Sequence, residues 1–259
     1  MPFASVIAAT DLTARSAQVP GRARALASGP GARVILAHVR PDERRKPSAE
    51  AVEAQLATLA VDCGADGHRL LIGEAGPALA ALAEAESAGL IVLGLHRVRG
   101  VLDLLRLTTM EKIVLAAPCP VLIAHLPPDR SYRQVLLATD FSPGSAAALI
   151  TAARIAPGAE FHAIHALQVP LGRDRDAAQE KAEAACAAFL ATPGLPPLAE
   201  PPEIVPGGVH QVLAYRHEEL GADLLCLGAS SGADPGRLGN YARDLMRAPP
   251  SDMLVARSP

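Results

Sequence analysis

Aromatic residues are scarce in this chain, which has no tryptophan, three tyrosines and four phenylalanines among 259 residues. Hydrophobic residues nevertheless make up 50 % of the sequence, and much of that share is alanine. Small and branched aliphatic side chains must therefore fill the core, which suits helices that pack closely on a sheet. The length is enough for two domains of about 130 residues each.

The chain also lacks a charge excess and long apolar stretches. Its formal net charge is −3, so no electrostatic feature favours nucleic acid as a partner. No stretch approaches the roughly 20 uninterrupted apolar residues of a membrane-spanning helix. The first apolar run is short and no positive residues precede it, unlike a signal sequence. We therefore expect a cytoplasmic protein without a membrane or nucleic-acid partner.

Cysteines are few, and none of the four forms a C-x-x-C pair. Cys226 lies in the apolar run 224–227, which favours a small buried hydrophobic residue over a disulfide or a metal ligand. His162 and His165 are three residues apart in an expected strand, so their side chains should point to opposite faces. No metal cluster is expected.

What the chain does contain is an internal repeat of three segments. Residues 6–13 (VIAATDLT) match residues 135–142 (VLLATDFS). The other matching pairs, in the same order along the chain, are 89–94 (GLIVLG) with 223–228 (DLLCLG), and 119–124 (CPVLIA) with 251–256 (SDMLVA). Matches in the same order indicate a duplication. A polar stretch with two prolines at 127–131 is suited to a linker, so we predict domains at 1–126 and 132–259.

Short apolar runs alternate with longer alanine-rich stretches in each half. The expected strands are 5–9, 33–39, 69–72, 90–93 and 121–125, then 134–138, 160–167, 203–205, 224–227 and 253–256. The expected helices are 16–28, 48–63, 77–88 and 108–116, then 143–155, 174–190, 209–220 and 241–247. This alternation predicts an α/β fold: two tandem doubly wound domains, each a five-stranded parallel sheet in the order 3-2-1-4-5 with helices on both faces.

In such a fold, ligands bind at the carboxyl ends of the strands. The first expected strand of each half ends in Ala-Thr-Asp, which places Asp11 and Asp140 there. An aspartate at this position can cap the next helix, or it can contact a ligand. Recurrence in both halves does not separate the two interpretations, because a duplication copies caps as well as sites.

The fourth expected strand of each half ends in glycine and leads into a loop before the last helix. In the second half this loop (GASSGADPGRLGN, 228–240) is rich in glycine. Its backbone N–H groups could approach a phosphate, although a surface loop would have a similar composition. In the first half the loop 94–109 carries bulky residues and the arginines Arg97, Arg99 and Arg106 instead.

The two halves resemble universal stress protein domains over essentially the whole chain. The features that carry the resemblance are Ala-Thr-Asp after the first strand, Leu-Ile-Val-Leu-Gly at the fourth, and Ala-Pro-Cys-Pro-Val-Leu-Ile before the linker. ATP-binding members of that family carry G-x2-G-x9-G-[S/T] between the fourth strand and the last helix. Neither half keeps this pattern whole. In the first half Arg97 and Leu107 stand at two of the glycine positions. In the second half Ser231 stands at a glycine position, Asn240 stands at the Ser/Thr position, and the gap is two residues shorter.

The resemblance implies a site for ATP or a related adenine nucleotide, with the first aspartate and a residue of the second strand at the adenosine part. Carried onto this sequence, the positions of the second domain are Asp140, Ala166, Gly228, Ser231, Gly239 and Asn240. Those of the first domain are Asp11, Val39, Gly94 and Thr108. Since Arg97 and Leu107 would crowd the first site, we expect binding in the second domain.

The function that the resemblance implies is a stress-response sensor or regulator that binds adenine nucleotide. The alternative is a structural or partner-binding stress module without bound nucleotide. The sequence offers no P-loop and no convincing nucleophile–base pair, so at most a slow ATPase is expected. Domain pairing within the chain, through the strands 121–124 and 253–255, and a homodimer are further expectations. Protein partners stay unknown at this stage.

Overall fold

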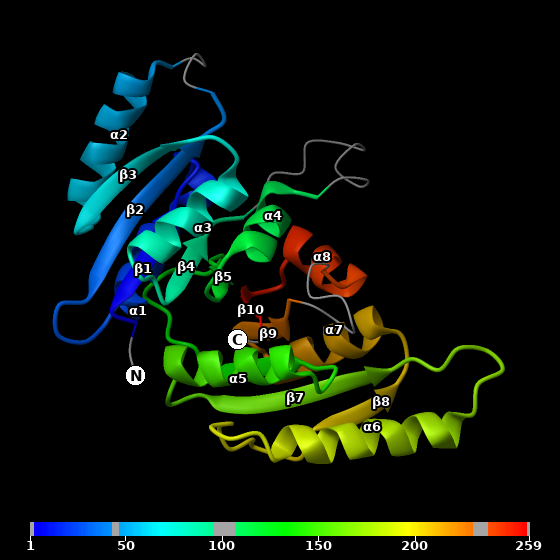
Figure 1. Ribbon diagram of the computed structural model, residues 1–259. Helices are drawn as coiled ribbons and strands as arrows, with labels where there is room; N and C mark the ends of the chain where they lie inside the picture. Colours follow the sequence, from blue (N-terminus) through cyan, green and yellow to red (C-terminus); the bar gives the residue numbers. More distant parts are fainter. Residues whose placement is uncertain (1–2, 43–46, 96–106, 230–237, 258–259) are drawn as a thin grey trace. The chain divides into compact units, whose positions relative to one another are not determined.

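The computed structural model describes residues 3–42, 47–95, 107–229 and 238–257. It divides into two compact units, residues 1–130 with 246–249 and residues 131–245 with 250–259. In the first unit the strand order is β3-β2-β1-β4-β5, and in the second it is β8-β7-β6-β9-β10 (Figure 1). All pairings within each unit are parallel. The expected order 3-2-1-4-5 is confirmed in both.

The elements of the first unit follow the predicted alternation. In chain order they are β1 (Ser5–Ala9), the 3-10 helix η1 (Ala14–Ser16), α1 (Val19–Leu26), β2 (Arg33–Arg40), α2 (Ala49–Asp62), β3 (Gly67–Ile72), α3 (Ala75–Ala85), β4 (Leu90–Leu93), α4 (Thr109–Ala116) and β5 (Val121–Ile123). The expected helix 16–28 is shorter than predicted. Pro20 stands in its first turn, where its missing N–H costs nothing, and Ala27 leaves the helix to bridge with Phe3.

The second unit repeats the same sequence of elements. They are β6 (Gln134–Ala138), α5 (Pro143–Ile155), β7 (Glu160–Leu167), α6 (Arg175–Leu190), β8 (Glu203–Pro206), α7 (Val209–Leu220), β9 (Leu224–Gly228), α8 (Asn240–Arg247) and β10 (Asp252–Ala256). Side chains cap the helix starts: Ser48 caps α2, Ser142 caps α5 and Asp174 caps α6. Gly221 ends α7 in the left-handed conformation that only glycine adopts without strain.

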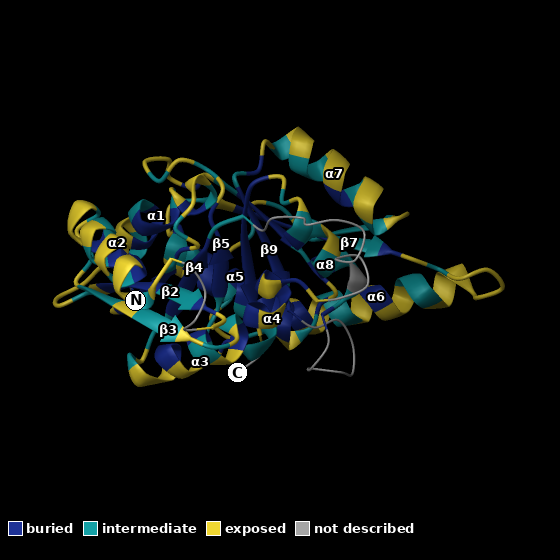
Figure 2. Cartoon of the chain, turned by 90° about the horizontal axis from the view of Figure 1, so that it is seen from above, coloured by how far each residue is buried: buried dark blue, intermediate teal, exposed yellow. Residues whose placement is uncertain are grey.

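The core of each unit lies on its central strands, which Figure 2 shows in the colour of buried residues. Residues 90–93 of β4 and 224–227 of β9 are fully or almost fully buried. Cys226 is buried in β9 as expected, and burial raises the pKa of its thiol. Edge strands β3 and β8 are only partly buried. The helices wind in two directions from the first strand, so both faces of each sheet are covered.

The segment that follows β5 is fastened to α1 by a buried arginine. Arg22 is 2 % exposed, and its guanidinium donates to the carbonyls of Arg130 at 2.8 Å and Pro127 at 2.9 Å. Gly21 lies under Pro128, so closely that an added Cβ would come within 2.9 Å of the proline ring. The first turn of α1 therefore holds the start of the predicted linker.

We expect Arg22→Met to lower the free energy of unfolding by about 2 kcal/mol, because it leaves two carbonyls without their charged donor. Arg24→Met on the same helix is the matched control. Arg24 pairs with Asp66 at 2.9 Å with both side chains well exposed, so its loss should cost less than about 1 kcal/mol. Urea unfolding of the two variants measures the difference, and equal costs would contradict the anchoring role.

Candidate functional site

The chain reverses its winding direction between the first and fourth strands of each unit. In the strand orders above, β1 lies beside β4 and β6 lies beside β9. At such a switch point the loops leave the sheet to opposite faces and open a crevice at the carboxyl ends of the strands. The segments that follow β1 and β6 therefore carry the candidate site, and they begin with Thr10-Asp11 and Thr139-Asp140.

A turn with the same hydrogen-bonding pattern follows the first strand of both units. In the second, Asp140 Oδ1 accepts from the Ser142 N–H at 3.0 Å and from the Ser145 hydroxyl at 2.8 Å. The Thr139 hydroxyl accepts from the Phe141 N–H at 2.8 Å. The helix cap of α5 is Ser142 rather than the aspartate. Asp140 therefore fixes the turn before the helix and does not cap the helix itself.

The first unit builds the same turn from its own residues. Asp11 Oδ1 accepts from the Thr13 N–H at 3.0 Å, from the Thr13 hydroxyl at 2.7 Å and from the Ser16 hydroxyl at 2.8 Å. The residue after the aspartate is left-handed in both units: Leu12 has φ 57° and Phe141 has φ 59°. Such backbone costs about 1 kcal/mol or more in a non-glycine residue, and it is concentrated at functional sites.

The second carboxylate oxygen distinguishes the two turns. Asp11 Oδ2 is engaged by the Arg15 guanidinium at 3.4 Å. Asp140 Oδ2 accepts no hydrogen bond from any residue in the described parts of the chain, and Asp140 is exposed. A free, negatively charged acceptor at the carboxyl ends of the strands can receive ligand hydroxyl or amino groups. Of the two aspartates, Asp140 is the one with an oxygen available for a ligand.

The pKa of Asp11 reflects its internal partners. Burial opposes ionisation, but hydrogen bonds from Thr13 and Ser16 and the charge of Arg15 outweigh it and hold the pKa of Asp11 below its usual value. The ionised form is thus stabilised by groups of the protein itself. Its contribution to stability is present above the unfolded-state pKa of aspartate and is lost as the pH falls through the lowered folded-state value.

The glycines that end the fourth strands have a packing role. A Cβ on Gly94 would lie 2.7 Å from the Arg15 carbonyl oxygen and 2.9 Å from Ser16 Cα. A Cβ on Gly228 would lie 3.0 Å from the Gly144 carbonyl carbon and from the Ser145 nitrogen. Both glycines therefore allow the turn after the first strand to close over the fourth.

The last helix of each unit starts differently. Thr108 caps α4 in a capping box: its hydroxyl accepts from the Glu111 N–H at 3.2 Å, and Glu111 Oε2 accepts from the Thr108 N–H at 2.6 Å. The first turn of α8 has no acidic residue, and Arg243 donates its N–H to the Gly239 carbonyl at 3.1 Å. Buried Glu111 places a carboxylate at the start of α4, whereas α8 begins without one.

The second-strand positions lie one residue beyond a histidine in each unit. Val39 in β2 pairs with Leu71, and Ala166 in β7 pairs with Val205. The preceding histidines, His38 and His165, each donate from Nδ1 to the carbonyl of the threonine that follows the first strand, at 2.8 Å. These histidines therefore tie the second strand to the aspartate turn. The His165 ring also lies 5.1 Å from that of Phe141.

Some predicted site residues fall outside the described parts. Ser231 and Arg97 do so entirely, and for Asn240 the backbone opens α8 while the side chain is outside the description. Leu107, expected to crowd the first crevice, is 41 % exposed.

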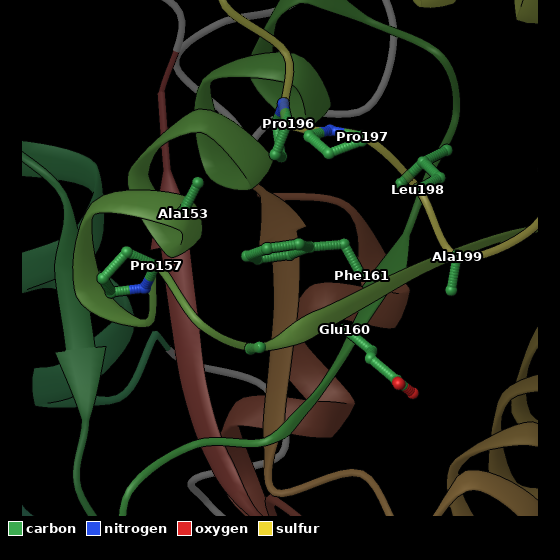
Figure 3. A pocket seen from close by; sticks show the side chains of 9 residues that line it. Ala153, Pro157, Glu160, Phe161, Pro196, Pro197, Leu198 and Ala199 are labelled. Carbon is green, nitrogen blue, oxygen red and sulfur yellow. The ribbon is translucent and has the colours of Figure 1, made fainter.

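A hollow of about 520 Å³ lies away from these residues, at the amino end of β7, with Phe161 and Pro196 among its lining residues (Figure 3).

Sequence reasoning missed the two serines that hold the aspartates. Ser16 is 3 % exposed and Ser145 is 1 % exposed, and each donates to the aspartate Oδ1. A signal was available, because the repeat extends to the spacing T-D-x-[T/S]-x-x-S in both halves. Comparison of the halves three residues further along would have found them.

Two doubly wound α/β units with matching turns at their switch points define a duplicated α/β domain. The universal stress protein family matches the chain twice, at residues 2–125 and 131–257. This protein belongs to the universal stress protein family, with two domains of that family in one chain. The resemblance seen in the sequence is thereby confirmed.

Solved structures of similar overall fold cover almost the whole chain. A universal stress protein from Archaeoglobus fulgidus DSM 4304 matches with a TM-score of 0.68 at 17 % identity, over 98 % of this chain and 96 % of the other. A functionally unknown protein from Pseudomonas aeruginosa PAO1 matches with a TM-score of 0.67 at 20 % identity, over 99 % and 93 %. At these identities the likeness shows the fold. A search of curated proteins found no match.

No helix in the described parts of the chain is long and apolar enough to cross a membrane. Within the same parts, no group of three or more histidine, cysteine or acidic side chains is placed to hold a metal ion.

Proposed function

We propose that this protein is a stress-response sensor or regulator that binds an adenine nucleotide in its second domain. The observation that carries the proposal is the state of the two aspartates: Asp140 presents a free carboxylate oxygen, whereas Arg15 occupies the corresponding oxygen of Asp11. Family membership supports the same assignment, because ATP-binding members place this aspartate at the adenosine part.

In the proposed complex, the adenosine part lies against Asp140 and Ala166, and the phosphates lie at the start of α8. The absence of an acidic residue from the first turn of α8 suits an anion there, since the positive end of a helix attracts negative charge by up to about 2 kcal/mol when partly buried. In the first domain the start of α4 instead carries the buried carboxylate of Glu111.

The experiment that tests the proposal starts from the purified full chain. Nucleotide released from it by denaturation is identified by mass analysis, and ATP affinity of the emptied protein is measured by calorimetry. Bound adenine nucleotide, or binding at one site per chain, supports the proposal. No copurified nucleotide together with no measurable ATP affinity would favour the alternative, a partner-binding stress module. Phosphate release above background would be needed to establish an ATPase.

We expect Gly239→Val to weaken ATP affinity at least tenfold, because a branched Cβ would occupy the approach of phosphate to the start of α8. The matched control is Leu107→Val, which changes the residue in the same frame of the first domain. Calorimetric titration of both full-length variants checks the difference. A loss of affinity in the Leu107 variant alone would place the nucleotide in the first domain and overturn the assignment.

A further inference from the structure

A proline-containing segment unique to the second domain lies beside the start of β7. This segment, residues 195–202 (LPPLAEPP), is the later part of the connection 191–202 between α6 and β8, and the Ala199 N–H donates to the Phe161 carbonyl at 2.9 Å. Figure 3 shows the Phe161 ring between Pro157 and the prolines of the segment. In the first domain only residues 63–66 connect α2 to β3. The backbone N–H of Asp66 donates to the Val34 carbonyl at 2.9 Å, as that of Ala199 does to Phe161.

Prolines have no N–H, so this segment can form few backbone hydrogen bonds and depends on side chains for attachment. Glu200 supplies that attachment. Its carboxylate accepts from His162 Nδ1 at 2.8 Å and also receives the Arg216 guanidinium. His162 stands in β7 and is 7 % exposed. Its counterpart in the first domain is Ile35, since Ile35 pairs with Ile7 as His162 pairs with Leu136.

The other ring nitrogen of His162 has a partner whose orientation is fixed. His162 Nε2 lies 3.0 Å from Gln134 Oε1. The amide group of the same glutamine donates from Nε2 to Glu160 Oε2 at 2.9 Å. Turning the amide round would set its oxygen against the Glu160 carboxylate. The oxygen of Gln134 therefore faces His162, which must donate to it.

Both nitrogens of His162 thus face acceptors, the Gln134 oxygen on one side and the Glu200 carboxylate on the other. Neutral imidazole has one N–H and can satisfy only one of them. The chain of hydrogen bonds that runs from Glu160 through Gln134 and His162 to Glu200 is complete only when the ring carries both protons. Deprotonation would either break the bond to Glu200 or force the glutamine to give up Glu160.

The surrounding groups favour the ionised form of Glu200, which accepts hydrogen bonds. Hydrogen bonding to His162, against a smaller effect of burial, and the charge of Arg216 hold the pKa of Glu200 below its usual value. Arg216 in α7 also binds Glu203 at 2.7 Å and Glu219 at 2.8 Å, so it has two partners that do not involve His162. Among the described residues, the printed contacts link the ring to Glu200 directly, to Arg216 through Glu200, and to Glu160 through Gln134.

We propose that His162 is a protonation-dependent latch that fastens the segment 195–202 to β7 of the second domain. With both ring nitrogens protonated, the segment covers Phe161. When the ring loses a proton, the attachment through Glu200 weakens and the segment opens more often. The latch stabilises the attachment while the ring carries both protons, and this contribution is lost when the ring is deprotonated.

Backbone hydrogen exchange of the full chain tests the latch, because the Ala199 and Asp66 amides occupy matching positions in the two domains. Protection at Ala199, divided by that at Asp66, should fall at least tenfold between pH 6 and pH 9. In His162→Asn, which can still donate to Glu200 but does not titrate, the ratio should stay constant across that range. His68→Asn, which removes the partly exposed histidine paired with Glu53 in the first domain, should keep the pH dependence of the parent protein.

The ring nitrogens give a second readout that needs no variant. Nitrogen NMR of ¹⁵N-histidine-labelled protein at pH 6 should show His162 with both nitrogens protonated. A neutral His162 at that pH, a ratio that does not change with pH, or an unchanged pH dependence in His162→Asn would each overturn the latch.

Discussion

Replacing Asp140 by asparagine is expected to weaken ATP binding about a hundredfold, because a charged acceptor becomes a neutral donor at the proposed site of the adenosine part. Asparagine keeps an oxygen in the position of Oδ1, which accepts from the Ser142 N–H and the Ser145 hydroxyl. The turn should therefore persist, with the free energy of unfolding changed by less than about 0.5 kcal/mol. Calorimetric titration and urea unfolding of the same variant measure both quantities.

Asp11→Asn is the matched control in the first domain. It removes the charge that pairs with Arg15 at 3.4 Å, so it tests the same position where the oxygen is already occupied. ATP affinity should be unchanged in this variant. If Asp140→Asn bound ATP as well as the parent but lost stability, Asp140 would be a structural turn residue and would leave the site.

The fold was predictable because the repeat and the strand alternation are encoded locally. Continuous apolar runs such as 90–93 and 224–227 require burial on both faces, and helices between them require parallel crossovers. The boundaries failed where tertiary contacts decide. The first helix was expected at 16–28, but Pro20 starts it late and the bridge between Phe3 and Ala27 ends it early.

The candidate site was less predictable, because the shared spacing of its residues does not show which hydrogen bonds they form. Asp140 was found from its place at a strand end, yet nothing in the sequence shows which of its oxygens is free. The serines below the aspartates act through contacts across five residues. Likewise, His162 could be placed on the face opposite His165, but its bonds to Gln134 and Glu200 join segments far apart in sequence.

Substitutions of the glycines at the strand ends should cause the largest losses of stability expected for this protein. Gly94→Ala should lower the free energy of unfolding by about 3 kcal/mol, because its Cβ would lie 2.7 Å from a backbone carbonyl oxygen that can move only with the whole turn. Gly228→Ala should cost about 2 kcal/mol, since its closest contacts, also to backbone, are at 3.0 Å. Gly158→Ala is the control: an added Cβ there meets nothing within 4 Å, so stability should hold or rise slightly.

Urea unfolding combined with ATP titration separates packing from phosphate approach at Gly228. If the glycine serves the packing of the turn over β9, Gly228→Ala loses stability, and added ATP recovers part of it in proportion to the affinity that remains. If the glycine serves only to let phosphate approach the backbone, the unfolding energy without nucleotide stays at the parent value and affinity alone falls. The second result would remove the packing role and would make Gly228 a ligand-contacting residue.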